Sequence, residues 1–200
     1  TRYAPLDQID RDNVADLEVV WRFKTENLGP RPDFNVRATP LMKGGVLYVS
    51  AGSRRRAAAI DAKTGETRWL YRPDEPDRAG SSRSSSGRGV AYWSDGDAAR
   101  VFLVTRSFRL IALDAETGQP APEFGEDGIV DLHQGLGREV KYGISSTSPP
   151  IVVGGVVVVG SSMPISLTTL STAPGHVRGY DPRTGKMLWI FHTIPQAGEP

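Results

Sequence analysis

A turn motif that recurs three times constrains the fold of this chain more than any other feature of its sequence. The pattern Asp-x-x-Thr-Gly occupies residues 61–65, 114–118 and 181–185, and the first and third copies continue to a tryptophan at the same offset. The Asp carboxylate can accept backbone N–H groups two or three residues further on. Gly then supplies the positive φ that a tight hairpin needs. Each copy therefore predicts the last hairpin of a small antiparallel sheet.

Two further strands are predicted before each of these hairpins. Turns rich in Gly or Asp separate them, and the paired segments are 38–42 with 46–50, 89–93 with 101–105, and 147–153 with 156–160. Four antiparallel strands, followed by the same unit again, are typical of a β-propeller blade. The sequence thus predicts an all-β fold, a β-propeller of four-stranded antiparallel blades.

About three blades fit into the chain. They are predicted at residues 36–72, 88–122 and 147–192. Because a blade cannot bury both of its faces alone, we expect Trp69 and Trp189 to lie wedged between neighbouring sheets. Propellers have four to eight blades, and closure protects their edge strands. We therefore expect the chain to be incomplete and inactive alone.

The N-terminal segment, residues 1–35, precedes the first predicted blade. Residues 10–17 indicate a short helical turn, and residues 19–23 indicate a strand. Since this strand comes before the first complete blade, we assign it to the closing blade of the propeller.

Composition excludes several classes of function. The chain has no cysteine, which excludes disulfides, thiol catalysis and cysteine metal sites. Its longest apolar run, residues 151–159, is interrupted by two glycines, whereas a membrane helix needs about 20 apolar residues. Lys and Arg number 24 against 23 Asp and Glu, so the net charge of +1 gives no reason to expect nucleic acid as a partner.

The longer repeat Ala-x-Asp-x-x-x-Gly-x-x-x-Trp resembles the tryptophan-docking motif of the quinoprotein (PQQ-dependent) alcohol and glucose dehydrogenases. Three other phrases are similar to segments of that family, at residues 2–9, 87–93 and 176–181. The resemblance covers essentially all 200 residues. It implies that residues 1–200 are part of an eight-bladed propeller with PQQ and a calcium ion on its central axis. In the family, a hydride passes from a sugar or alcohol to the quinone.

The resemblance assigns a cofactor-binding role to three residues. Arg88 matches an arginine that pairs with a PQQ carboxylate, a task that suits a planar and permanently charged fork. Thr147 and Ser162 match a threonine and a serine that hydrogen-bond PQQ. The alternatives are an arginine on a blade surface for Arg88 and ordinary loop positions for Thr147 and Ser162.

The chain also departs from the family pattern. Ile165 stands where the alcohol-oxidising members have a calcium-binding glutamate, and isoleucine offers no oxygen to a hard cation. Pro164 lacks the backbone N–H that a cofactor carboxylate could use. Residues 82–86, all Ser or Arg, occupy the region of the alcohol enzymes' vicinal disulfide. These departures favour the sugar-oxidising branch and leave no metal ligand to assign.

The function predicted from the sequence is a segment of a periplasmic or extracellular PQQ-dependent oxidoreductase acting on a sugar or alcohol. Its partners would be that substrate, an electron acceptor and the remaining blades of the propeller, without nucleic acid or a membrane span. No residue can be assigned as the catalytic base. The alternative is a non-catalytic, PQQ-like propeller that serves as a scaffold or binding module in the cell envelope.

Three other signals are set aside. Gly87-Arg88-Gly89 lacks the further glycine and the lysine of phosphate-binding loops. His133, His176 and His192 are too scattered for a local metal motif. The basic run at residues 54–56 is interpreted as the solvated entry of a strand.

Overall fold

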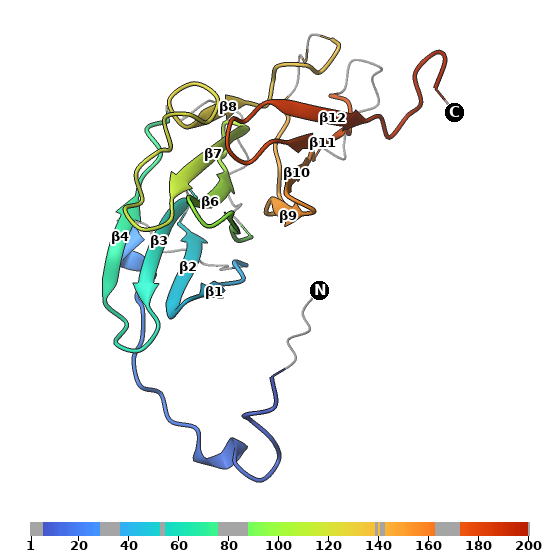
Figure 1. Ribbon diagram of the computed structural model, residues 1–200. Coiled ribbons are helices and arrows are strands. Elements are labelled where there is room, and N and C mark those ends of the chain that lie inside the picture. Colours follow the sequence, from blue (N-terminus) through green and yellow to red (C-terminus); the bar gives the residue numbers. More distant parts are fainter. Residues whose placement is uncertain are drawn as a thin grey trace.

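The computed structural model describes residues 6–28, 37–52, 55–75, 88–138, 140, 143–162 and 173–199. Within these ranges the chain forms three four-stranded sheets and two short 3₁₀ helices, η1 (Val14–Asp16) and η2 (Thr25–Leu28). Figure 1 shows the sheets following one another along an arc, with the N-terminal segment extending away from them.

Each sheet is an antiparallel meander in which successive strands pair in chain order. The first contains β1 (Leu41–Lys43), β2 (Val46–Ala51), β3 (Arg56–Asp61) and β4 (Thr67–Tyr71). The second contains β5 (Ala91–Ser94), β6 (Ala99–Val104), β7 (Arg109–Asp114) and β8 (Ile129–Asp131). The third contains β9 (Ile151–Val153), β10 (Val156–Gly160), β11 (Val177–Tyr180) and β12 (Met187–Phe191). The prediction of an all-β fold built from such sheets is confirmed.

The second sheet ends later than the sequence pattern indicates. We expect this blade to end at residue 122, yet its fourth strand, β8, follows only at Ile129–Asp131. Two prolines explain the delay, because Pro120 and Pro122 have no N–H to donate to a ladder. Residue 120 makes only an isolated bridge to Leu113, and regular pairing with β7 begins at Ile129.

The N-terminal segment confirms one expectation and leaves another as a prediction. The helical turn predicted at residues 10–17 is confirmed by η1. The strand predicted at residues 19–23 stays a prediction, because its partners were expected in the closing blade; among the described residues this stretch has no strand pairing. Trp21 and Phe23 instead pack on the outer face of the first sheet, against Ala58 and Ile60.

The core consists of layers between successive sheets. Between the first and second sheets lie Tyr48, Trp69, Leu103 and Ile111, all buried. Between the second and third sheets a separate layer is formed by large side chains from both, including Phe102, Phe108, Phe124, Val157 and Tyr180. Face-to-face burial of successive small sheets is the packing expected of propeller blades.

Trp69 is buried between the first two sheets, as predicted, and it docks on the turn of the second. Its indole is 8% exposed, and its Nε1–H donates to the carbonyl of Ala115 at 3.0 Å. The ring lies over Gly118, where an added Cβ would approach the indole to 2.5 Å. Trp21 repeats this arrangement one sheet earlier, donating to the carbonyl of Ala62 at 3.1 Å.

Burial of Trp189 was predicted on the same grounds and is wrong for this structure. Its side chain is 41% exposed. Most other residues of β12 are exposed as well. The physical reason is that no sheet follows β12 among the described residues, so that the indole has no turn to dock on.

The second sheet lacks a docking tryptophan and contacts the third sheet by other means. The N–H of Gly125 donates to the carbonyl of Thr184 at 2.9 Å. The buried Arg100 donates from Nη1 to the carbonyl of Arg183 at 2.8 Å. Both bonds end on the third copy of the turn motif. This turn therefore contacts the second sheet although no tryptophan docks on it.

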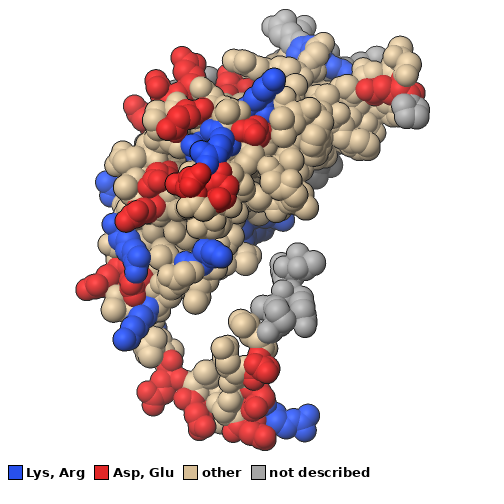
Figure 2. All heavy atoms as spheres, in the orientation of Figure 1, with Lys and Arg blue, Asp and Glu red and all other residues tan. Residues whose placement is uncertain are grey.

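Charges of both signs lie interspersed on the face shown in Figure 2, with a broad uncharged area toward the C-terminal end. Among the residues that the structure describes, no helix is both long and apolar enough to cross a membrane.

Candidate functional site

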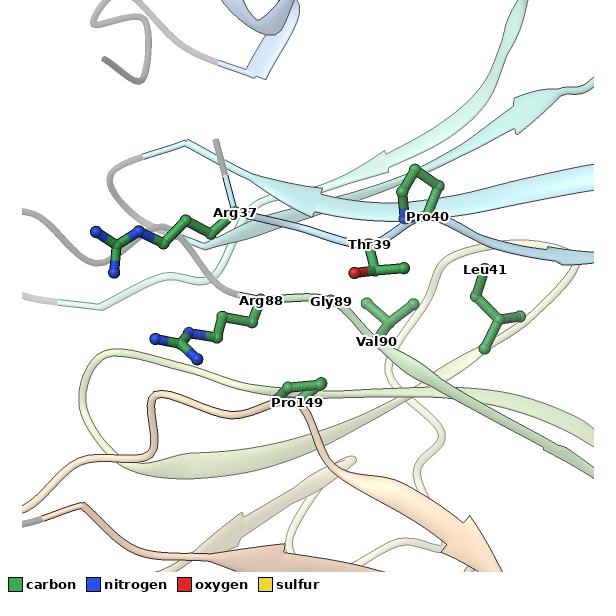
Figure 3. A pocket seen from close by; sticks show the side chains of 8 residues that line it. All are labelled: Arg37, Thr39, Pro40, Leu41, Arg88, Gly89, Val90 and Pro149. Atoms are coloured by element: carbon green, nitrogen blue, oxygen red, sulfur yellow. The ribbon is translucent and has the colours of Figure 1, made fainter. Parts of the chain in front are cut away.

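A cleft of about 620 Å³ lies where the first strands of the three sheets begin. This volume falls within the range typical of small-molecule sites. The lining comes from all three sheets: Arg37, Thr39, Pro40 and Leu41 from the first, Arg88, Gly89 and Val90 from the second, and Pro149 from the third. The cleft therefore lies where β1, β5 and β9 begin, each the first strand of its own sheet (Figure 3).

Backbone pairing between two sheets places Arg88 in this cleft. The N–H of Thr39 donates to the carbonyl of Arg88 at 3.0 Å, and Thr39 forms a parallel bridge with Gly89. Gly89 has a φ of +142°, and a Cβ there would lie 3.0 Å from the carbonyl oxygen of Thr39. A larger residue would therefore push the two segments apart. The glycine after Arg88 serves the close approach of the two backbones.

The cleft is chemically suited to an anion. Arg37 and Arg88 both extend their guanidinium groups along one wall, and the hydroxyl of Thr39 adds a donor (Figure 3). Among the described lining residues there is no Asp or Glu. Guanidinium groups bind carboxylates through two parallel hydrogen bonds, which gives strength and orientation together. A carboxylate-rich group such as PQQ therefore fits the donors of this cleft.

Thr147 and Ser162 lie on two adjoining segments of the third sheet. Ser162 pairs with Ser145 through two backbone hydrogen bonds, 2.6 Å and 3.2 Å long. Thr147 is half-buried and comes two residues before Pro149, which lines the cleft. Thus Arg88 lies in the cleft itself, while Thr147 and Ser162 are not among its lining residues. Their predicted contact with a cofactor stays a prediction.

Arg37 is the residue of this cleft that the sequence analysis missed. It stands before the first predicted strand, in a segment with no repeated motif. The available signal was its position: Arg37 and Arg88 each come shortly before the first strand of a sheet, at residues 41 and 91. Only the structure shows that the two arginines line one cleft.

The described residues bring together no group of three or more His, Cys, Asp or Glu that could hold a metal ion. The departures at Pro164 and Ile165, and the stretch at residues 82–86, lie outside the described residues. Two of the histidines do meet: the rings of His176 and His192 are 4.6 Å apart, edge to face. Burial, helped by the neighbouring His192, lowers the pKa of His176.

Arg55, in the basic run at residues 54–56, is not part of the solvated strand entry that we predicted; Arg54 lies outside the described residues. Arg55 is 2% exposed, and its Nη1 donates to the carbonyls of Val104 and Thr105 in the second sheet. Burial lowers the pKa of Arg55 to about 10, and the positive charge of Arg106 adds to this effect. Arg55 therefore ties the first two sheets together.

The whole chain, residues 1–200, matches the family model described as the β-propeller domain of PQQ-dependent glucose, ethanol and alcohol dehydrogenases. The chain belongs to this family. The match agrees with the three sheets, the docked tryptophans and a cleft whose donors suit a carboxylate-rich cofactor.

Relatives that act on different substrates are about equally similar to the chain. It is 31% identical to the quinoprotein glucose dehydrogenase A of Acinetobacter calcoaceticus, over 96% of the chain and 26% of that protein. It is 34% identical to the quinohemoprotein alcohol dehydrogenase ADH IIB of Pseudomonas putida, over 100% of the chain and 25% of that protein. These identities do not separate the sugar-oxidising from the alcohol-oxidising branch.

A solved structure shares the fold. The quinohemoprotein alcohol dehydrogenase from Comamonas testosteroni superposes with a TM-score of 0.75 at 31% identity, covering 100% of this chain and 27% of that one. The chain therefore spans about a quarter of the length of the relatives that it matches.

Proposed function

We propose that the cleft at the start of β1, β5 and β9 binds PQQ, and that the protein is a dehydrogenase that oxidises a sugar or an alcohol. The observation that carries this proposal is the cleft itself. Segments next to all three sheets contribute to it, and Arg37 and Arg88 are the charged residues of its lining. Membership of the PQQ family supplies the identity of the anion.

In this proposal the residues of the chain bind and orient the cofactor. Arg88 pairs with one of its carboxylates, and Gly89 keeps the backbone close enough to Thr39 for the arginine to stay in place. Thr147 and Ser162 donate or accept hydrogen bonds at its rim. When bound, PQQ supplies the acceptor for a hydride. The base that takes the proton of the substrate hydroxyl must lie within hydrogen-bond reach of it, and we assign that role to no residue of this chain.

Calcium is proposed on the family resemblance alone. Ca²⁺ takes six to eight oxygen ligands. The described residues bring no such set of carboxylates together. The ligands of a bound calcium ion would therefore include residues outside the described ones. A periplasmic or extracellular location, an electron acceptor and further blades of the same propeller belong to the same proposal.

One observation favours a second candidate, a propeller that serves as an envelope scaffold without catalysis. Ile165 stands where the family's alcohol-oxidising members carry a calcium ligand. The two arginines of the cleft argue against it, because a scaffold has no need of cationic side chains at one cleft, whereas an anionic cofactor does.

Reconstitution of the full-length protein tests the proposal. The purified apoprotein is supplied with PQQ and calcium, and reduction of an artificial electron acceptor is followed with a panel of sugars and alcohols. We expect PQQ-dependent reduction with at least one substrate of these classes. PQQ binding without turnover on any of them would leave the cleft as a binding site and favour the scaffold; absence of binding would refute the proposal.

A further inference from the structure

We propose that His176 and His192 form a binding site for a divalent transition-metal ion of the class of Cu²⁺ and Ni²⁺, on the outer strands of the third sheet. Neither histidine lines the cleft, and the inference does not depend on the proposed cofactor function. The two residues are distant in sequence, so that no short motif announces the pair.

Strand pairing brings the two histidines together. β11 and β12 are neighbours in the third sheet (Figure 1), and Val177 pairs with Phe191. His176 and His192 are the next residues on the two strands, so they lie opposite each other just beyond the end of the ladder. Side chains of opposite residues in an antiparallel pair are neighbours on one face. The ring centres are 4.6 Å apart, and the ring planes make an angle of 69°.

Each imidazole offers a nitrogen to an ion. His176 is 6% exposed, and its Nδ1 makes no hydrogen bond among the residues that the structure describes. A buried polar atom of this kind calls for an explanation, and binding to an ion is one. In His192, Nδ1 lies 2.6 Å from Oε1 of Glu199. Because the carboxylate accepts, Nδ1 carries the hydrogen and Nε2 keeps its lone pair.

Glu199 orients the ring of His192 in the way that metal sites require. A metal-ligating histidine usually donates its other N–H to a carboxylate or a carbonyl, which fixes the tautomer and raises the basicity of the ligating nitrogen. The second oxygen of Glu199 accepts from the backbone N–H of Gln196 at 2.8 Å. The carboxylate is therefore itself held in place.

The charges around the pair partly cancel. Arg138 and Arg178 act on His176 with positive charge, which opposes a bound cation, whereas Glu199 acts with the opposite sign. The Glu199 carboxylate thus supports the site by its charge as well as by its hydrogen bond.

The spacing of the rings selects the class of ion. A metal bonded to an imidazole nitrogen at about 2.0–2.1 Å lies about 3.2 Å from the ring centre. Two ring centres 4.6 Å apart then hold one ion at an angle of about 90°. This angle suits square-planar or tetragonal Cu²⁺ and Ni²⁺, whereas tetrahedral Zn²⁺ needs the rings further apart.

The site is open and has two protein ligands. The described residues bring no third side-chain ligand to the pair, so water completes the coordination. Because the rings lie edge to face, one of them turns when the ion binds. The terminal torsion of histidine is broad, and His192, whose side chain is 21% exposed, has the room to turn.

The test is a titration of Cu²⁺ and Ni²⁺ into the full-length apoprotein, prepared without a histidine tag and without PQQ, which binds metals itself. Excess Ca²⁺ is present to occupy sites built from oxygen ligands. Since loss of an outer-shell partner costs about 10- to 100-fold in affinity, we expect about 10-fold for Glu199→Gln. His176→Gln and His192→Gln each remove a ligand and should cost at least about 100-fold. The EPR spectrum of bound Cu²⁺ should show coupling to two imidazole nitrogens.

His133→Gln is the matched control. The Nδ1 of His133 also lies 2.8 Å from a carboxylate, that of Asp131, but the ring beside it is Phe108 and not a second histidine. This variant removes one imidazole bonded to a carboxylate and should leave the affinity for both ions unchanged. Thermal melts without metal show whether each variant still folds.

The outcomes decide between a built site and a single surface imidazole. Loss of affinity in His176→Gln and His192→Gln, with none in His133→Gln, supports the inference. A loss in His192→Gln alone overturns it, and so does equal affinity in the wild type and all variants. If His176→Gln does not fold, the EPR spectrum of the wild type decides, because coupling to only one imidazole nitrogen also overturns the inference. The proposed cofactor function is tested separately with PQQ and is unaffected by any of these results.

Discussion

Trp69 and Trp189 occupy the same place in two nearly identical sheets and have opposite surroundings. Each lies on the last strand of its sheet, opposite a small residue of the strand before, Ala59 or Gly179. Both strand pairs carry a register shift directly after that residue. Yet Trp69 is 8% exposed and Trp189 is 41% exposed.

The difference teaches that docking is a property of the interface and not of the sheet. Trp69 donates to Ala115 and covers Gly118, both of which belong to the following sheet. Trp189 has no following sheet among the described residues, and its indole lies over Gly179 of its own sheet. The sequence motif places the tryptophan on the last strand of its sheet, and contact with the following sheet buries it.

The largest expected effect is a difference between two matched substitutions. In residues 1–200, Trp69→Ala should lower the free energy of unfolding by about 3–5 kcal/mol, because it removes a buried indole and leaves a cavity. Trp189→Ala should cost less than about 1 kcal/mol, as expected of a substitution at an exposed position. Urea unfolding of both variants checks this, and equal costs would contradict the comparison.

The next effect concerns the glycine beneath the docked indole. Gly118→Ala places a Cβ 2.5 Å from the ring of Trp69 at a φ of +72°, so that backbone strain and displacement of the indole add together. We expect a loss of about 2–4 kcal/mol. Gly154→Ala is the control, because its φ is +56° but nothing lies within 4 Å of the added Cβ. It should cost about 1 kcal/mol. Similar losses would mean that the glycine serves the turn alone.

The smallest expected effect is on the pKa of Asp61, which depends on contacts within its own turn and should not depend on the docking of Trp69. A hydrogen bond from Arg68, at 2.6 Å, and two from backbone N–H groups lower the pKa of Asp61 to about 2. The carboxylate therefore contributes stability at pH values above its unfolded pKa of about 3.8, and this contribution is lost as the pH falls toward 2. In an NMR titration Arg68→Ala should raise the pKa of Asp61, whereas Trp69→Ala should leave it unchanged. A shift in the second variant would show that turn and interface are coupled.

The sequence predicts the local parts of this fold well. Asp and Gly at fixed spacing specify a turn through their own side chain and backbone, and all three predicted turns are present with positive φ at residues 65, 118 and 185. Elements that depend on distant partners do not follow from such a local motif. A strand at residues 19–23 needs strands that the described residues do not supply, and β8 begins only after Pro120 and Pro122.

The residues of the cleft also divide into those that a local motif indicates and those that only contacts between sheets bring into place. Arg88 was found because it lies in a recognisable phrase between two glycines. Arg37 was not, because its place on the cleft wall follows from the contact between two sheets, which no short motif encodes. Arg55 was misjudged for the same reason, since its burial depends on carbonyl groups about 50 residues further along the chain.

The most direct test of the account is a titration of PQQ into the full-length apoprotein and its Arg88→Ala variant. A hydrogen bond to a charged group contributes about 1.5–3 kcal/mol, and about 1.4 kcal/mol corresponds to a tenfold change in affinity. We therefore expect Arg88→Ala to bind PQQ about 10- to 100-fold more weakly, with an unchanged thermal melt in the absence of cofactor. Equal affinity in the two proteins would contradict the central claim, because Arg88 would then be an arginine on a blade surface and not the anchor of a cofactor.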